Sequence, residues 1–224
     1  MRGKDVGREI DLLVNYPRSK RNVEERGQQK TEEDRQIARR FDREFFDGDR
    51  RHGYGGFNYL PRFWQPVAPT FREHFGLRAG DRLLDVGCAK GFMMHDFALL
   101  IPGLVVKGVD VSRYAVEHAI EDMRPHVQVA DARRLPFPDK SFDVVVSINT
   151  IHNLAREDCG QALREIERVA RRGAFVTVDA YRSEEERERM RAWNLTAQTI
   201  LHVDEWKAFF AEVGYTGDYY WFIP

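Results

Sequence analysis

Cysteine is scarce in this 224-residue chain, and so are long apolar runs and any excess of one charge. Two cysteines, Cys88 and Cys159, are too few for a disulfide framework, so we expect a reducing, cytoplasmic environment. No apolar run reaches transmembrane length, and residues 1–13 lack the apolar core of a signal peptide. The formal net charge of −1 gives no basic footprint for nucleic acid. We therefore expect neither a membrane nor a nucleic-acid partner.

The stretch between residues 82 and 110 organises the rest of the chain. Its apolar run Leu83–Val86 is typical of a buried strand, although so short a run also fits a buried helix. A loop of small residues, 87–91, leads into a helix-compatible segment, Phe92–Leu100. A second strand, Leu104–Val109, then ends at Asp110. The pattern predicts a βαβ unit with a glycine turn at its first strand–helix junction.

Two acids suggest which ligand this turn accepts. Asp110 follows the loop by about twenty residues, where a carboxylate can accept both hydroxyls of a ribose. The loop lacks the G-x-G-x-x-G spacing of dinucleotide sites, and Asp85 at its mouth would repel a pyrophosphate. S-adenosyl-L-methionine offers a ribose for Asp110 and a sulfonium and an ammonium for Asp85. The alternative is an ordinary glycine turn with surface acids.

Four motifs in order resemble the class I S-adenosyl-L-methionine-dependent methyltransferases, from about residue 82 to residue 178. They are LLDVGCAKG, VKGVDVS, VADARRLPFPDKSFDVVVS and a strand after Arg172-Gly173, with Ala89 in place of the usual middle glycine. The resemblance implies an α/β fold, a doubly wound and mostly parallel sheet of six to seven strands. It also implies a cofactor loop formed by Asp85, Gly87, Ala89 and Gly91. Asp110 and Val111 would then hold the ribose and adenine, and Asp131 and Ala132 would flank the adenine amino group. Cys88 in the loop and Ser147 after strand four complete the predicted cofactor set.

The segment before the first strand, residues 1–76, is expected to cover a catalytic domain of residues 77–224. Residues 1–30 form a polar arm whose basic cluster, Arg18, Lys20 and Arg21, is interpreted as solvated, with phosphate binding as a weaker alternative. Thr31 is expected to cap one helix that runs to Gly48, with an apolar stripe at Ile37, Phe41 and Phe45.

Residues 52–64 are rich in glycine and aromatic side chains. They suit either a loop packed by its own aromatics or a flap over the cofactor and substrate. In the flap interpretation, Tyr54 and Arg62 contact the amino-acid end of the cofactor. Arg62 is chosen because its planar fork of donors suits a carboxylate.

Polar residues 147–153 follow the carboxyl end of the fourth predicted strand, the edge at which doubly wound sheets bind ligands. His152 is the candidate general base, or else a residue that only caps a turn. Asn149 and Tyr181 are predicted to orient the substrate, with Asp179 and His202 as further candidates. The seven histidines show no metal-binding spacing, so no metal is expected.

The end of the chain is expected to supply two helices and a last strand. Helix Glu157–Arg171 has an apolar face, Asp204 is expected to cap a helix through Glu212, and Tyr215–Ile223 corresponds in the family to an antiparallel strand. Neither an Asn/Asp-Pro-Pro-Tyr stretch nor a Pro-Cys nucleophile follows the fourth strand, which disfavours base-amine and cytosine methylation.

The prediction is therefore a methyltransferase that acts on an O or N atom of a small molecule. A sugar, sugar nucleotide or natural-product-like acceptor is expected, and S-adenosyl-L-homocysteine is the expected second product. The alternatives are a protein or RNA methyltransferase working with a partner, and a non-catalytic cofactor-binding subunit.

Overall fold

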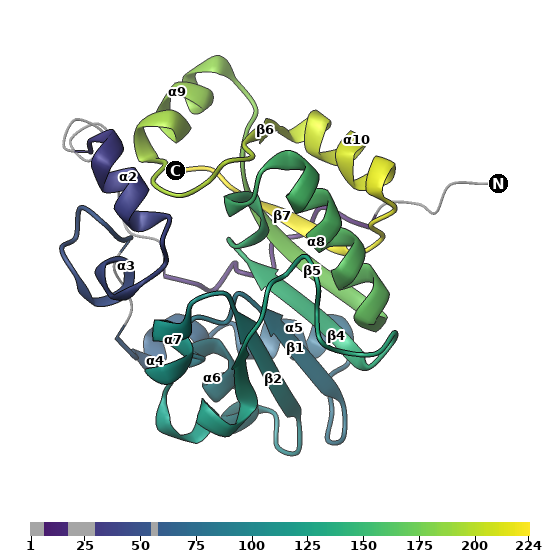
Figure 1. Cartoon of the computed structure of the whole chain (residues 1–224). Coiled ribbons are helices and arrows are strands. Elements are labelled where there is room, and N and C mark those ends of the chain that lie inside the picture. The colour runs from purple at the N-terminus through teal and green to yellow at the C-terminus, as the bar shows by residue number, and fades with distance from the viewer. Residues whose placement is uncertain (1–6, 18–29, 55–57) are drawn as a thin grey trace.

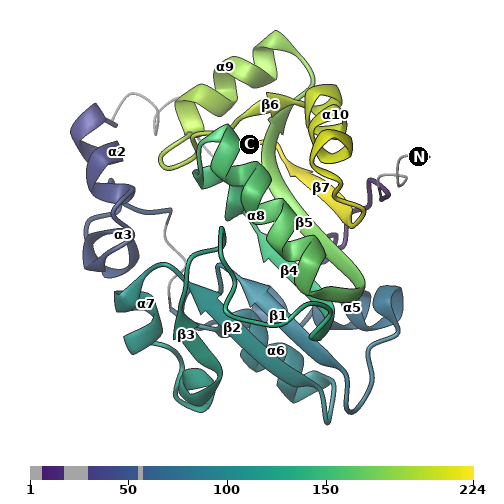
Figure 2. The same ribbon diagram turned by 45° about the vertical axis from the view of Figure 1, so that its right-hand side comes forward.

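Five parallel strands form the centre of this protein (Figures 1 and 2). A computed structural model describes residues 7–17, 30–54 and 58–224. The five are β1 (Arg82–Val86), β2 (Val105–Asp110), β3 (Val127–Val129), β4 (Phe142–Ile148) and β5 (Ala170–Tyr181). Their spatial order is β3-β2-β1-β4-β5, so the direction of winding reverses between β1 and β4. In doubly wound sheets the ligand crevice lies outside the strand ends at this reversal.

The last two strands extend the sheet beyond β5, and one of them corrects a prediction. Strand β6 (Leu201–His202) pairs with the end of β5, and β7 (Asp218–Phe222) pairs with residues 175–179 of β5. The terminal strand was expected to be antiparallel, but β7 is parallel to β5. The physical reason is helix α10 (Val203–Val213), which crosses over between β6 and β7 and returns the chain to the same end of the sheet.

Helices cover both faces of the sheet and complete a core on each side. One face carries α8 (Arg156–Val169) and α10, and the other carries α5 (Ala68–Phe75) and α6 (Phe92–Leu100) (Figure 2). The predicted apolar face of α8 is fully buried, with Leu163, Ile166 and Val169 each 0% exposed. Burial of each such side chain contributes roughly 1.5–3 kcal/mol. Helix α5 was assigned by sequence to the covering segment, yet its Phe71 packs in the core under the sheet.

The single helix predicted over residues 31–48 is wrong, because the structure divides it in two. Thr31 caps α2 (Glu32–Ala38) through a capping box with Asp34, as predicted for the start. The chain then turns at Phe41, whose φ is 49°, and Asp42 caps α3 (Arg43–Asp47). This turn points Phe45 and Phe46 toward helix α7 (Arg113–Glu117), where they become buried. Figure 1 shows α2 and α3 set apart from the sheet, with α3 the nearer of the two to α7.

The remaining helical elements lie between the strands and helices already described. They are α4 (Pro61–Trp64), α9 (Glu184–Trp193), and the 3-10 helices η1 (Glu121–His126) and η2 (Ile151–Asn153). Ser112 caps α7, and α10 is capped by His202 and not, as predicted, by Asp204. No helix in the described ranges combines the length and apolar character that crossing a membrane requires.

The N-terminal arm lies against the sheet where the structure describes it. The Tyr219 N–H donates to the Arg8 carbonyl over 3.1 Å, and the Ile10 N–H donates to the Tyr219 carbonyl over 3.0 Å. Glu9 thus forms an isolated parallel bridge with Tyr219 of β7, and Leu12, 1% exposed, is buried in the core. Arg18, Lys20 and Arg21 lie outside the described residues.

Candidate active site

The loop after β1 has the backbone conformation of a ligand-binding turn. Gly87, Ala89 and Gly91 all have positive φ angles, of 88°, 48° and 78°. A Cβ on Gly87 would lie 2.1 Å from the Thr150 hydroxyl oxygen, so only glycine fits there. Asp110, at the end of β2, accepts the Ala89 N–H over 2.8 Å and the Ser112 N–H over 2.8 Å. Asp110 thus fixes the loop, and its remaining lone pairs stay available to a ligand.

Asp85 and Asp110 give this end of the site a negative character. Asp85 is 4% exposed, and burial together with the charge of Asp110 raises its pKa to about 8. Burial also raises the pKa of Asp110, against the opposing effect of the N–H groups that it accepts. Within the described part of the chain, no lysine or arginine pairs with either carboxylate; Lys90 of the same loop pairs with Asp47 instead. A bound cation would relieve the cost of ionising both acids.

A cavity of about 1110 Å³ opens from this loop along the carboxyl ends of the strands. Small-molecule sites typically measure roughly 300–1,000 Å³, so this volume can hold a cofactor and a second ligand. One end is formed by the glycine loop, and the other by residues that follow β4 and β5. Side chains of α2, α3 and α9 contribute the outer wall.

Most of the predicted site residues line this cavity, including the further candidate Asp179, and five do not: Gly91, Ser147, Arg62, Tyr181 and His202. The others that line it are Tyr54, Asp85, Gly87, Cys88, Ala89, Asp110, Val111, Asp131, Ala132, Asn149 and His152. Gly91 is buried at the start of α6, and the Ser147 hydroxyl donates to the Val86 carbonyl to tie β4 to β1. Arg62 is exposed, with its guanidinium over the Phe63 ring. Tyr181 packs beside His202 and under Arg187, outside the cavity.

Asp131 does not present a free carboxylate. Arg133 donates to both of its oxygens over 2.6–3.0 Å and also reaches Asp158 over 2.8 Å. Hydrogen bonds and charge from Arg133 hold the pKa of Asp131 below its usual value. The carboxylate is therefore fixed in an ion-pair network, and the sequence prediction had not included Arg133.

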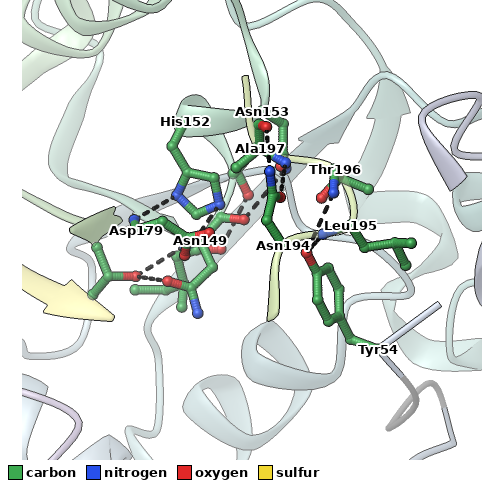
Figure 3. A network of polar contacts seen from close by, with 12 residues as sticks. Tyr54, Asn149, His152, Asn153, Asp179, Asn194, Leu195, Thr196 and Ala197 are labelled. Carbon is green, nitrogen blue, oxygen red and sulfur yellow. Dashed lines mark hydrogen bonds and ion pairs between the residues drawn. The ribbon is translucent and has the colours of Figure 1, made fainter. Parts of the chain in front are cut away.

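His152 and Asp179 lie beside each other at the far end of the cavity (Figure 3). The Asp179 N–H donates to Nδ1 of His152 over 3.0 Å, and Nε2 lies 3.6 Å from Oδ1 of Asp179. Since a backbone N–H can only donate, Nδ1 is unprotonated and the hydrogen of the neutral ring is on Nε2. Burial lowers the pKa of His152 to about 3. This geometry does not supply the free, basic nitrogen that a general base needs.

Asn149 and Tyr54 approach the same end of the cavity from different elements (Figure 3). Asn149 has a φ of 51°, and its side-chain oxygen accepts the Thr177 hydroxyl over 2.8 Å. The Tyr54 hydroxyl accepts the Leu195 N–H over 2.8 Å and the Thr196 N–H over 3.3 Å. Tyr54 therefore holds the segment after α9. Residues 55–57 of the predicted flap lie outside the described residues, and closure of the flap stays a prediction.

Sequence reasoning missed a group of residues that line the cavity from α2 and α9. They include Arg39, Arg189 and Trp193. Nε of Arg39 is buried and has no hydrogen-bond partner in the described chain, although Nη1 reaches Glu32 over 3.3 Å. Arg189 and Trp193 share a helix face at i, i+4 spacing, and this spacing is the sequence signal that could have placed both on one side of α9.

Comparison with known proteins agrees with the fold and the loop. Residues 84–178 match the methyltransferase domain family. Over 152 residues the chain is 34% identical to 27-O-demethylrifamycin SV methyltransferase of Amycolatopsis mediterranei, covering 62% of this chain and 55% of that protein. It is 31% identical over 162 residues to the tRNA (carboxymethyluridine(34)-5-O)-methyltransferase of Arabidopsis thaliana, covering 66% of this chain and 38% of that protein.

The crystal structure of the YcgJ protein from Bacillus subtilis has the same fold, with a TM-score of 0.53 and 24% identity. That match covers 65% of this chain and 66% of YcgJ. The resemblance to class I S-adenosyl-L-methionine-dependent methyltransferases is confirmed by the match of residues 84–178 to the methyltransferase domain family and by the shared fold. The chain spans only 55% and 38% of the two curated relatives named above.

Proposed function

We propose that this protein transfers a methyl group from S-adenosyl-L-methionine to an O or N atom of a small molecule. The observation that carries the proposal is the pair Asp85 and Asp110, two buried carboxylates without a basic partner in the described chain. They face a cavity large enough for donor and acceptor together. Such a pair favours a cationic nucleoside and disfavours one that carries phosphates.

The donor would lie along the loop with its ribose at Asp110 and its charged end near Asp85. Tyr54 and Arg62 were predicted to meet its amino-acid end, but only Tyr54 lines the cavity. Arg39 takes the place of Arg62 in this proposal, because it lines the cavity and its buried Nε has no partner there. When bound, the donor supplies a methyl group already activated by its sulfonium. The protein then contributes mainly alignment of the acceptor.

A small acceptor is favoured by the walls of the cavity. Tyr54, Trp193 and Phe222 supply flat apolar surfaces, and Asn149 and Gln198 supply polar contacts. This mixture suits a sugar, sugar nucleotide or natural-product-like molecule. The relative from Amycolatopsis mediterranei is named for O-methylation of such a product. The tRNA-modifying relative makes RNA the second candidate, although a net charge of −1 provides little attraction for it.

Two measurements test the proposal. Calorimetry should show S-adenosyl-L-methionine and S-adenosyl-L-homocysteine binding to the protein, with NAD and ATP as non-binding comparisons. Asp110→Ala should weaken donor binding by at least about 100-fold, because the ribose site and the loop contacts are lost together. Asp139→Asn is the control, since Asp139 is exposed and pairs with Arg168 away from the cavity.

Methyl transfer is then assayed with methyl-labelled donor and three acceptor pools: hydroxylated and aminated small molecules, bulk tRNA, and denatured protein. Label in the small-molecule pool supports the proposal. Label in tRNA or protein alone would replace the proposed acceptor class. Binding without transfer to any pool would favour a non-catalytic subunit.

A further inference from the structure

His152 and Asp179 divide their roles in the reverse of the usual arrangement, in which a carboxylate orients a basic histidine. Here the main chain of Asp179 occupies Nδ1 of His152, and the ring hydrogen on Nε2 faces Oδ1 of Asp179 at 3.6 Å. This distance is longer than a hydrogen bond, so the neutral imidazole lies beside the carboxylate with its N–H toward it. The imidazole could take up a proton only at Nδ1, which the Asp179 N–H already occupies, whereas a carboxylate has several lone pairs.

The backbone on both sides of the pair is fixed. The His152 carbonyl accepts the Gln198 N–H over 3.0 Å and the Thr199 N–H over 2.9 Å. The Asp179 carbonyl accepts Nε1 of the buried Trp206 over 3.0 Å. Residues far apart in the sequence therefore fix the backbone positions of His152 and Asp179 relative to each other. Rotating the ring to free Nδ1 would break its hydrogen bond with the buried Asp179 N–H.

Both side chains border the cavity in which the acceptor is proposed to lie. Asp179 is 4% exposed, at the carboxyl end of β5, and it lines the cavity together with His152. Tyr54 faces the same region from the segment before α4, and the charge of Asp179 contributes to the raised pKa of that phenol after burial.

We propose that Asp179 is the catalytic residue that binds the acceptor hydroxyl or amine and receives its proton, and that His152 is a positioning residue that orients Asp179. The inference rests on the proposed methyl transfer. The acceptor oxygen or nitrogen forms its bond to the methyl carbon while the bond from that carbon to sulfur breaks. The electron pair of the broken bond stays on sulfur, and the acceptor proton moves to the Asp179 carboxylate.

The first test needs no acceptor. Long-range ¹H–¹⁵N spectra of His152, assigned by comparison with His152→Gln in the S-adenosyl-L-homocysteine complex, report the tautomer between pH 5.5 and 8.5. The expected result is a neutral ring with its hydrogen on Nε2 over the whole range. A ring that gains a proton in this range, or one with its hydrogen on Nδ1, would overturn the proposal.

The second test uses the labelled-donor assay with the hydroxylated and aminated pool. Asp179→Asn should lower kcat by about 10²–10⁴-fold, the usual contribution of a positioned acid–base group. Donor affinity by calorimetry should stay within about twofold. Asp179→Glu should recover part of kcat and keep an acidic limb in its pH profile, which a purely structural role for Asp179 would not produce. His152→Gln should lower kcat less than Asp179→Asn does, while Asp139→Asn serves as the matched control.

Asp179→Asn with wild-type kcat, or His152→Gln with the greater loss, would contradict the assignment. If the wild-type protein transfers no methyl to any pool, the proposed function fails. The tautomer of His152 then still decides how the pair is arranged.

Discussion

Both carboxylate oxygens of Asp47 lie 2.7 Å from Nζ of Lys90, which joins helix α3 to the loop after β1. The Tyr114 hydroxyl donates to the same carboxylate over 2.7 Å. Burial alone would raise the pKa of Asp47, but the hydrogen bonds from Lys90 and Tyr114 outweigh it and leave the pKa lowered. The covering segment is therefore attached to the loop that is proposed to bind the donor.

Breaking this link should loosen the covering segment and weaken donor binding. Asp47→Ala removes the carboxylate that pairs with the Lys90 ammonium, whose side chain is only 9% exposed. We expect a loss of about 1–3 kcal/mol in the free energy of unfolding, measured by urea denaturation, since Asp47 itself is partly exposed. Calorimetry should show weaker binding of S-adenosyl-L-homocysteine. Asp49→Asn is the control, because Asp49 is fully exposed and contacts Arg51 within the same turn. Equal behaviour of the two variants would contradict the link.

Asp85 should make the stability of the ligand-free protein fall as pH rises. Its pKa in the folded state is about 8, above the usual value near 3.8, so the folded state binds more protons than the unfolded state between these pH values. Asp85→Asn should therefore raise the Tm at pH 8 and change it little at pH 4. Each kcal/mol corresponds to roughly 2–4 °C for a chain of this size. A variant that is less stable than wild type at pH 8 would argue against a costly buried charge.

Asp85→Asn should also reduce the preference of the protein for S-adenosyl-L-methionine, a sulfonium, over S-adenosyl-L-homocysteine. S-adenosyl-L-methionine carries a fixed positive charge that S-adenosyl-L-homocysteine lacks. In the wild-type protein, binding of S-adenosyl-L-methionine relative to S-adenosyl-L-homocysteine should become tighter between pH 6 and pH 9, as Asp85 ionises. Asp85→Asn should flatten this dependence. Titration calorimetry of both ligands at several pH values measures it, and an equal slope in the variant would remove Asp85 from donor recognition.

Tyr54→Phe should disturb the segment after α9 without removing any apolar contact. The lost hydroxyl leaves the Leu195 and Thr196 N–H groups unpaired, at a cost of about 1–3 kcal/mol. Tyr181→Phe is the matched control, because Tyr181 lies outside the cavity and no hydrogen bond of its hydroxyl is found in the described chain. We expect faster amide hydrogen exchange at residues 195–196 in the first variant only. Full activity in Tyr181→Phe would also remove that residue from the catalytic candidates.

Asp143 should make stability fall at acidic pH. It is 2% exposed, accepts the Arg82 N–H over 2.9 Å and pairs with Arg171 and Arg172. Burial would raise its pKa, but hydrogen bonds from Arg171 and the Arg82 N–H lower it overall. Its stabilising contribution is thus present above about pH 4 and is lost as pH falls through the folded-state pKa.

Asp143→Ala should cost about 2–4 kcal/mol at pH 7, less than a fully buried pair because both arginines are partly exposed. Denaturation between pH 3 and pH 7 should show the gap to wild type closing at the acidic end. Asp139→Asn, whose carboxylate is largely exposed, should show little change. A gap independent of pH would mean that the loss is one of packing.

Local sequence determined the strands, the glycine loop and most of the helix caps. The periodicity of apolar residues, short apolar runs and capping residues each reflect interactions within a few positions of the sequence. For this reason β1, α6 and the Thr31 and Ser112 caps could be predicted from local sequence. Asp85 and Asp110 could be placed for the same reason, since each is fixed by its distance from the loop.

Tertiary structure decided what the polar residues do. The turn at Phe41, the parallel direction of β7 and the position of Arg62 outside the cavity all follow from packing between distant segments. The tautomer of His152 is set by the N–H of Asp179, 27 residues later in the chain. A sequence states which side chain carries an imidazole, but the tautomer and pKa of that ring depend on neighbours that only the fold brings within hydrogen-bond distance.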